Sequence, residues 1–321
     1  MRRRKFSYFT SGGSEADNQA LISAAALGKK QGKCHIVSTA MEHHAILHTL
    51  EALQAEGFTV TLLRPQADGI VTATQVAEAI TDNTCLVSVM YANNETGSIQ
   101  PIREIGALCR KRGVLFHTDA VQAAGHLTID VQRDNIDMLS LSAHKFHGPK
   151  GIGLLFAKSN IQLTSLIRGG GQERGKRAGT ENLPGIIGLA AALKDAQEHM
   201  QQNTAYITGL RDALRNGLDK IDGAGFNGSR EHCLPGTVHY SFQGVNGEAL
   251  LSLLSNEGIC CSSGSACSAG SLEPSHVLLA LGLSHEKAQS ALRFSLCEYN
   301  TMDEVQTIIT KVTEAVIRLR R

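Results

Sequence analysis

The chain has 321 residues, 42% of them hydrophobic, and a formal net charge of +1. This length allows one large domain or two ordinary ones, and the charge offers no electrostatic basis for binding nucleic acid or a membrane surface. No apolar run approaches the roughly 20 residues of a membrane span, and the basic start lacks the apolar stretch of a signal peptide. We therefore expect a cytoplasmic protein whose partners are small molecules or other proteins.

The eight cysteines include no CxxC pair. In a chain of this length, that usage does not predict a disulfide framework or a zinc ribbon. We expect most of the cysteines to be reduced and to act as small buried hydrophobic residues. The sequence therefore predicts no firm resident metal site.

Strand and helix patterns alternate along the first part of the chain. Apolar runs predict strands at residues 6–10, 35–38, 58–63, 85–91, 114–118 and 136–141, and helices are expected up to residue 30 and over 43–56, 73–80 and 101–112. Such alternation is typical of an α/β fold with a mostly parallel sheet covered on both faces. In these sheets the ligand lies at the carboxyl ends of the strands.

The glycines before the first helix form a candidate phosphate site. Gly12 and Gly13 precede Ser14, whose spacing to Asp17 resembles a helix-capping pair. Free N–H groups at a helix start can hold an anion. Small residues also begin helices that bind nothing, so both interpretations stay open.

Polar residues follow four of the predicted strands where each strand ends. They are His43, Asn94, Asp119 with Gln122, and Ser142 with His144 and Lys145. Because these strand ends meet at one edge of the sheet, we expect the side chains to converge there. Each residue alone also has a structural interpretation, as a turn former, a loop cap or a helix N-terminal residue.

Lys145 is the candidate covalent residue. It stands between a buried strand and the chain-breaking Gly148 and Pro149, and hydroxyls and imidazoles surround it in sequence. Desolvation and neighbouring cations lower the pKa of an amine, which can then form a Schiff base with an aldehyde cofactor. The alternative is a lysine in a surface turn.

A glycine-rich basic loop at residues 168–177 leads to Thr180. It is either a solvated turn or an anion site, in the second case across a subunit interface. A long helix, broken near residues 201–204, is expected over 183–221. We expect a large domain at residues 1–200, a connecting helix at 201–222 and a small domain at 223–321.

The last part of the chain predicts a smaller α+β domain. Strands are expected at residues 237–242, 259–262 and 292–297, and helices at 247–257, 275–281 and 302–319.

Cys260 and Cys261 lie in an apolar run and are expected in the core. Cys267 lies among serine, glycine and alanine, which predicts an exposed nucleophile that travels, or else an incidental surface cysteine. Arg293, in an apolar strand, needs an anionic partner, either a substrate carboxylate or a salt bridge.

Eight motifs in order resemble those of the cysteine desulfurases, which are pyridoxal-phosphate (PLP) enzymes of the class V aminotransferase family. They are FTSGGSE at 9–15, EHHA at 42–45, NNETG at 93–97, DAVQ at 119–122, SAHK at 142–145, RAGTEN at 177–182, SSGSAC at 262–267 and LRFS at 292–295. The resemblance runs from Phe9 to the C-terminus. It implies a fold-type I large domain that binds PLP and a small domain that carries the cysteine loop.

The resemblance also implies a role for each candidate residue. Lys145 holds PLP covalently, and Asp119 pairs with the pyridinium nitrogen so that the ring can accept electrons. The other implied contacts are stacking by His43, hydrogen bonds near the phenolic oxygen from Gln122 and Asn94, phosphate contacts from Ser14, Ser142, His144 and a partner subunit's copy of Thr180, and substrate carboxylate binding by Arg293 with Asn94.

The implied reaction converts L-cysteine to L-alanine. The freed Lys145 shuttles the Cα proton, and the Cys267 thiolate takes the sulfur as a persulfide. Delivery to a sulfur acceptor such as an iron–sulfur scaffold follows, with Cys267 as the candidate transient iron–sulfur ligand through its persulfide. A homodimer is also implied.

The chain departs from the family at its start, because only eight residues precede the FTSG motif. Family members carry a longer segment there, so we expect an N-terminally truncated large domain. Three hypotheses remain open: a cysteine desulfurase, another fold-type I PLP enzyme such as a selenocysteine lyase or an aminotransferase, and an inactive remnant. Only the first makes Cys267 essential for turnover.

Overall fold

The computed structural model describes residues 6–264 and 274–321. The chain divides into two compact units, the first made of residues 1–64, 71–92 and 100–198 and the second of residues 65–70, 93–99 and 199–321. The boundary after residue 198 falls within α6 (Leu183–Leu218). The break predicted near residues 201–204 is wrong, because that polar stretch contains neither glycine nor proline and continues the helix.

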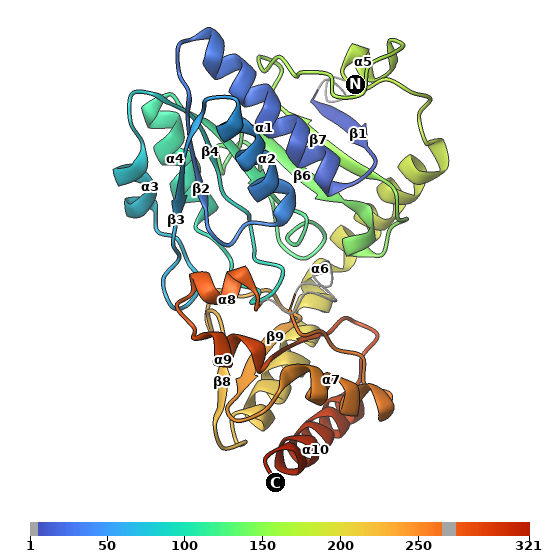
Figure 1. The fold of residues 1–321 in the computed structure, drawn as a ribbon. Helices are drawn as coiled ribbons and strands as arrows, with labels where there is room; N and C mark the ends of the chain where they lie inside the picture. Colours follow the sequence, from blue (N-terminus) through green and yellow to red (C-terminus); the bar gives the residue numbers. More distant parts are fainter. Residues whose placement is uncertain (1–5, 265–273) are drawn as a thin grey trace. The chain divides into compact units, whose positions relative to one another are not determined.

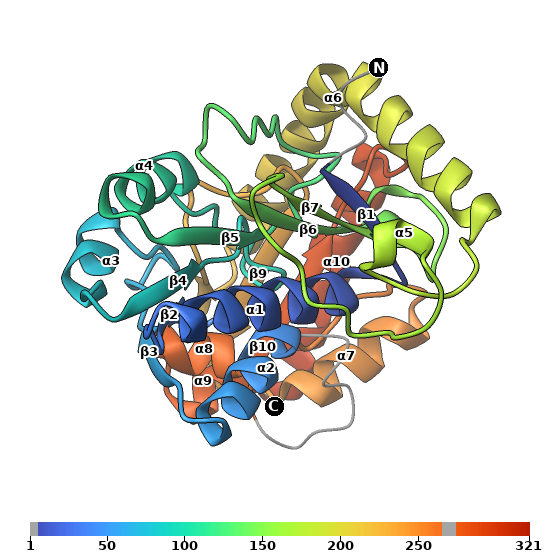
Figure 2. The same ribbon diagram turned by 90° about the horizontal axis from the view of Figure 1, so that it is seen from above.

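The first unit contains a seven-stranded sheet in the order β1-β7-β6-β5-β4-β2-β3 (Figures 1 and 2). The strands are β1 (Ser7–Thr10), β2 (His35–Thr39), β3 (Thr59–Leu63), β4 (Thr84–Ser88), β5 (Leu115–Asp119), β6 (Met138–Ser142) and β7 (Gly153–Ala157). Neighbours from β3 to β6 are parallel, whereas β7 runs antiparallel to β6 and to β1. The mostly parallel sheet predicted from the sequence is confirmed.

Helix α1 (Gly13–Lys30) packs across this sheet on β4 to β7. Ala16, Ala20 and Ala24 are fully buried and recur every four residues, and Gly28 continues their stripe. A Cβ at Gly28 would lie 2.5 Å from the Cβ of Cys85 on β4. The small side chains therefore let the helix axis approach the strands closely. The other helices of this unit are α2 (His44–Ala55), α3 (Ala73–Ala79), α4 (Ile102–Arg112), the 3-10 turn η1 (Ala143–Phe146) and α5 (Gln172–Gly175).

The second unit is built on a three-stranded antiparallel sheet in the order β10-β9-β8. Its elements are β8 (Ala224–Phe226), β9 (Thr237–Phe242), α7 (Gly247–Asn256), α8 (His276–Ala280), α9 (His285–Gln289), β10 (Ala291–Ser295) and α10 (Met302–Leu319). The strand predicted at 259–262 is wrong, since only Ser262 pairs there, in an isolated bridge to Arg293. The core of the unit gathers residues of α6, α7, α10 and the sheet around Tyr240 and Phe242.

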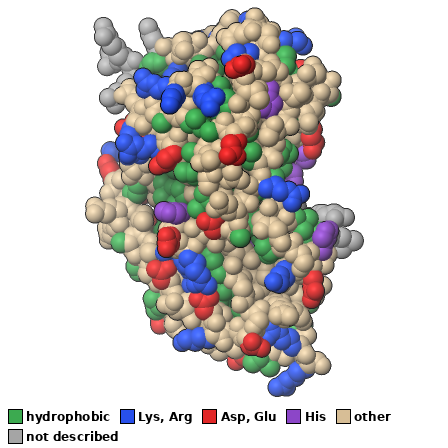
Figure 3. Space-filling view, turned by 90° about the vertical axis from the view of Figure 1, so that its left-hand side faces the viewer, with side chains coloured by type: hydrophobic (Ala, Val, Ile, Leu, Met, Phe, Trp, Pro, Cys, Tyr) green, Lys and Arg blue, Asp and Glu red, His purple; other side chains and the backbone are tan. Residues whose placement is uncertain are grey.

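Charged side chains of both signs are interspersed over the face shown in Figure 3, in keeping with a net charge of +1. Within residues 6–264 and 274–321, no helix is long and apolar enough to cross a membrane.

We predict opposite effects from two glycine-to-alanine changes in helices. In Gly106→Ala, the new Cβ would meet the carbonyl oxygen of Asp134 at 2.0 Å. That backbone clash outweighs a gain in helix propensity of about 1 kcal/mol, so the free energy of unfolding should fall by about 2 kcal/mol. Gly209 has no atom within 4 Å of the built Cβ, and Gly209→Ala should stabilise by about 0.5–1 kcal/mol. Urea unfolding measures both, and an unchanged Gly106→Ala midpoint would contradict the clash.

Candidate active site

Lys145 lies on the 3-10 turn η1, directly after β6, as the sequence predicts. His147 closes the turn with a φ of 63°, and Nε2 of His126 donates to the backbone oxygen of Lys145 over 3.1 Å. Lys145 itself is exposed. The expectation that its surroundings bury the amine is therefore wrong for the chain as it stands, because a short turn past the sheet edge leaves the side chain outside the core.

The start of α1 lies against the end of β6. A Cβ at Gly12 would lie 3.8 Å from Oγ of Ser142, and one at Gly13 would meet Cγ2 of Val121 at 2.6 Å. Oγ of Ser142 is 2.9 Å from Nδ1 of His144, and burial lowers the pKa of His144. Gly12 is the N-cap and supplies no side-chain hydrogen bond. Two sequence-predicted phosphate residues thus meet beside an uncapped helix start.

The predicted capping pair of Ser14 and Asp17 is wrong. Helix α1 already begins at Gly13, so Ser14 stands exposed in its first turn and Asp17 is buried, 1% exposed. Glu15 instead accepts a hydrogen bond of 2.7 Å from the backbone N–H of Ser11. The error comes from placing the helix start two residues too late, which a glycine N-cap makes easy.

Asp119 ends β5 and is buried, 6% exposed. Burial raises the pKa of its carboxyl to about 6, and both the hydrogen bond from the Val121 N–H, 2.9 Å to Oδ1, and the charge of Lys145 oppose that rise. Gln122 follows, half-buried. A buried carboxyl of this kind is well suited to pair with a cation, because water cannot screen the interaction.

His43 is the N-cap of α2, so its structural interpretation is confirmed. Its Nδ1 accepts from the Ala45 N–H over 3.1 Å. The ring is half-buried, and the preceding Glu42 is fully buried. Oε1 of Glu42 accepts from the Met90 N–H at 2.9 Å and from the Thr39 hydroxyl at 2.8 Å. Burial raises the pKa of Glu42 to about 8.

A row of buried polar groups beneath α1 was not predicted. His117 places Nδ1 2.9 Å from Oγ of Ser88 and Nε2 3.0 Å from Oγ of Ser140, and Oδ1 of Asp17 lies 3.7 Å from the same Nε2. Burial lowers the pKa of His117 to about 3 and raises that of Asp17, which the nearby Asp119 raises further. Burial thus favours the neutral form of both groups. The period-two alternation of Leu115, His117 and Asp119 is the signal that could have identified this row.

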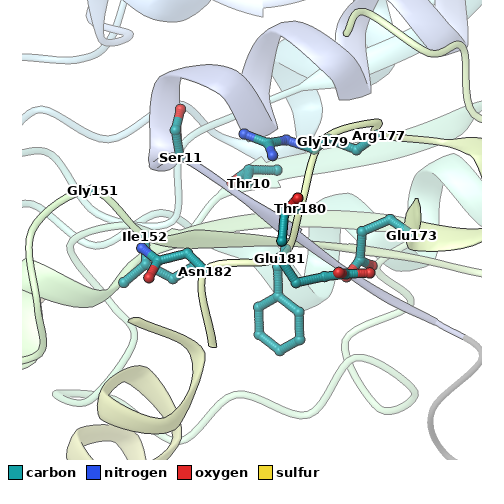
Figure 4. A pocket seen from close by; sticks show the side chains of 11 residues that line it. Thr10, Ser11, Gly151, Ile152, Glu173, Arg177, Gly179, Thr180, Glu181 and Asn182 are labelled. Carbon is teal, nitrogen blue, oxygen red and sulfur yellow. The ribbon is translucent and has the colours of Figure 1, made fainter. Parts of the chain in front are cut away.

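Thr180 is exposed and lines a pocket of about 280 Å³ in the first unit (Figure 4). The pocket is lined by Phe9, Thr10, Ser11, Gly151, Ile152, Glu173, Arg177, Gly179, Thr180, Glu181 and Asn182. Nε of Arg177 donates to Glu15 over 3.0 Å, which ties the basic loop to α1. The loop is thus not a freely solvated turn.

Asn94 and Arg293 belong to the second unit. Arg293 lies on β10, and its NH1 donates to the backbone oxygen of Asn94 over 2.7 Å.

Cys261 is half-buried, and burial raises the pKa of its thiol to about 11. Cys260 is exposed, so the prediction that it lies in the core is wrong. Cys267 lies outside the described residues. Among the residues that are described, no group of three or more His, Cys, Asp or Glu side chains could hold a metal ion.

Comparison with known proteins identifies the family. Residues 4–308 match the family model described as aminotransferase class-V. The chain belongs to that family. Within this family, a cysteine desulfurase IscS from Clostridium botulinum is 50% identical to this chain over 317 residues. The aligned part covers 98% of this chain and 79% of that protein. A cysteine desulfurase IscS from Methanosarcina thermophila is 47% identical over 313 residues, with 98% and 77% covered.

Solved structures of class V relatives superpose on this chain. One described as a NifS-like protein gives a TM-score of 0.91 at 37% identity and covers 98% of this chain and 83% of its own. SspA in complex with cysteine gives a TM-score of 0.78 at 39% identity, with 92% and 83% covered. The chain is therefore a cysteine desulfurase homologue with the predicted aminotransferase-like α/β fold.

Class V enzymes of this kind depend on pyridoxal phosphate, and the first unit fits that cofactor. The glycine N-cap leaves the start of α1 open to a phosphate, and the absence of a Cβ at Gly12 and Gly13 keeps room beside Ser142. The buried Asp119 carboxyl suits a protonated ring nitrogen. Each of these features belongs to the described chain itself.

We predict that Glu42 makes stability fall with pH in the cofactor-free protein. The pKa of its carboxyl is raised from 4.5 to about 8, so the unfolded state loses this proton first. Its contribution is complete below pH 4.5 and is lost as the pH rises to 8, by up to about 1.4 kcal/mol per pH unit. Glu42→Gln should remove this decline in urea-unfolding free energy between pH 5 and 9. Glu51→Gln, an exposed site on the same helix, is the control; parallel profiles for Glu42→Gln and the unchanged chain would refute the assignment.

Proposed function

We propose that this chain is a pyridoxal-phosphate-dependent cysteine desulfurase that converts L-cysteine to L-alanine. The observation that carries the proposal is the meeting of an uncapped glycine helix start, the Ser142–His144 pair and the buried Asp119 around the turn that bears Lys145. The 50% identity to a cysteine desulfurase IscS and the likeness to SspA in complex with cysteine support this substrate.

The cofactor-binding residues have distinct tasks. Lys145 binds the aldehyde carbon covalently and Asp119 binds the ring nitrogen, while His43 covers the ring face. The hydroxyl and imidazole groups of Ser14, Ser142 and His144 bind the phosphate together with the N–H groups at the start of α1, and Gln122 and Asn94 donate near the phenolic oxygen. When bound, the cofactor supplies an electron sink for the substrate Cα.

The substrate is oriented by Arg293, whose guanidinium suits a bidentate contact with the cysteine carboxylate. The Lys145 amine carries the proton removed from Cα. The Cys267 thiolate attacks the substrate sulfur, so an S–S bond forms as the C–S bond breaks, and Cys267 keeps the sulfur as a persulfide. Reprotonation of the carbon skeleton then gives alanine. A sulfur-acceptor protein such as an iron–sulfur scaffold removes the outer sulfur, and we propose that the protein is cytoplasmic.

A homodimer completes the phosphate site with the partner's copy of Thr180. Large apolar side chains of the first unit stand exposed beside the Thr180 loop in sequence: Leu183 at 61%, Ile187 at 69% and Ile167 at 41%. Leu183 and Ile187 share one face of α6, since they are four residues apart. Such a face is typical of a subunit interface. A second copy of this chain is the occupant that the family implies.

We predict a borohydride-reducible visible absorption band when PLP is titrated into the purified chain. Lys145→Ala should abolish the band, because no other group is expected to bind the aldehyde covalently there. Lys150→Ala, an exposed lysine on the same segment, should retain it. If the unchanged chain forms no band, it is an inactive remnant and the catalytic proposal is wrong.

We predict that Cys267→Ala lowers alanine formation from cysteine by about 100-fold or more while PLP binding persists, because the sulfur loses its nucleophile. Cys260→Ala, the exposed cysteine nearby in sequence, is the matched control and should keep full turnover. Alanine and sulfide are measured with PLP-loaded protein. Undiminished turnover in Cys267→Ala would point instead to an aminotransferase or a selenocysteine lyase, which selenocysteine as substrate would distinguish.

A further inference from the structure

Glu95 is a buried carboxyl that the proposed mechanism does not use. It is 1% exposed and lies in the loop that contains Asn94. Oδ1 of Asn93 accepts from the N–H groups of Glu95 and Thr96, each over 2.9 Å, and Gly97 leaves the turn with a φ of 76°. The loop is therefore held by its own hydrogen bonds, which fix the position of the buried Glu95 carboxyl.

The partners of Glu95 lie 169 and 180 residues later in the chain, and both belong to the second unit, as Glu95 does. Oγ of Ser275 donates to Oε2 of Glu95 over 2.5 Å. A Cβ on Gly264 would lie 3.5 Å from the same oxygen. Gly264 and Ser275 stand on the two sides of residues 265–273, the segment that contains Cys267. The Glu95 carboxyl is thus hydrogen-bonded to the end at Ser275, and the end at Gly264 lies near the same oxygen.

The first of these ends is also bound to the substrate-binding arginine. The N–H of Ser262 donates to the Arg293 oxygen over 3.1 Å, and the Arg293 N–H donates to the Ser262 oxygen over 2.7 Å. Oγ of Ser262 donates to the Gly264 oxygen over 2.8 Å. Since Arg293 also donates to the Asn94 oxygen, the loop of Glu95, the Arg293 strand and both ends of the cysteine segment form one hydrogen-bonded cluster.

We propose that Glu95 is a positioning residue for sulfur transfer, which holds the Ser275 end of the Cys267 segment in the cluster that binds the Ser262 end to Arg293. This inference rests on the proposed function. Holding two chain ends at one point reduces the conformations open to the residues between them. The attacking thiolate is then found more often within reach of the substrate sulfur that Arg293 positions. Glu95 itself touches no substrate, so its loss should slow transfer without weakening cofactor or substrate binding.

The anchoring itself is tested by hydrogen exchange, which needs no catalysis. In Glu95→Ala, the amides of residues 275–277 should exchange at least about 5-fold faster than in the unchanged chain, because Ser275 loses its partner. Amides of β9 should not change. An unchanged exchange rate at residues 275–277 would overturn the proposal, whether or not the chain proves to be a desulfurase.

The kinetic consequence is tested with PLP-loaded protein. Glu95→Ala should lower kcat for alanine formation about 10-fold, with the KM for cysteine and the visible absorption band unchanged. Glu95→Gln keeps an acceptor oxygen for Ser275 and should recover most of the rate. A proportionate loss of the absorption band, or a kcat within twofold of the unchanged chain, would overturn the positioning role.

Two controls separate this role from general destabilisation. Ser275 also caps α8, so Ser275→Ala is compared with Ser284→Ala, which removes the equivalent N-cap of α9. Only Ser275→Ala should lower kcat, and combined with Glu95→Ala it should add little, because the two groups form one contact. Glu257→Gln, at a surface pair with Lys311, controls for the lost charge. If the unchanged chain binds no PLP, the proposed function fails and the exchange experiment alone decides the anchoring.

Discussion

The close approach of backbone around Gly12 and Gly153 is the constraint on which the first unit's site depends. A Cβ at Gly153 would lie 2.6 Å from the carbonyl carbon of Gly12 and 2.7 Å from the Leu141 oxygen, so no larger residue fits without moving two strands. This contact brings the start of α1 onto the ends of β6 and β7. The close fit also involves Gly13, where a Cβ would meet Cγ2 of Val121 at 2.6 Å and Cβ of Ser142 at 3.6 Å. Anion binding and sheet packing thus share one geometric requirement.

The charge distribution of the first unit depends on the protonation of the side chains buried beneath α1. Burial raises the pKa of Asp17, raises that of Glu42 to about 8 and lowers that of His117 to about 3, so it favours the neutral form of all three groups. Asp119 has a much smaller rise, to about 6, because Val121 and Lys145 favour its charged form. Asp119 therefore ionises at a lower pH than Glu42, and its charged form would suit a cationic ring bound there.

Much of the sheet could be predicted, because buried parallel strands such as Thr84–Ser88 lie in largely apolar runs that are bounded by turn-forming residues. The elements missed, among them β7 and β8, are short or glycine-containing and carry little periodicity of their own. The strand-end residues were found from their position, but the His117 row was not, since the alternation of Leu115, His117 and Asp119 does not by itself show which face of the strand a helix covers. The exposure of Lys145 and Cys260 depends on tertiary packing, which local sequence does not report.

The imidazole of His43 has two roles, because it caps the start of α2 and is proposed to cover the cofactor ring. Nδ1 of His43 accepts the Ala45 N–H, so in the neutral ring the proton must sit on Nε2. Protonating the ring would turn that acceptor into a donor and break the cap, which costs helices about 1 kcal/mol. The helix therefore favours the tautomer of the neutral ring that carries its proton on Nε2. At this position asparagine could keep the cap and phenylalanine could keep an aromatic face, but neither could do both.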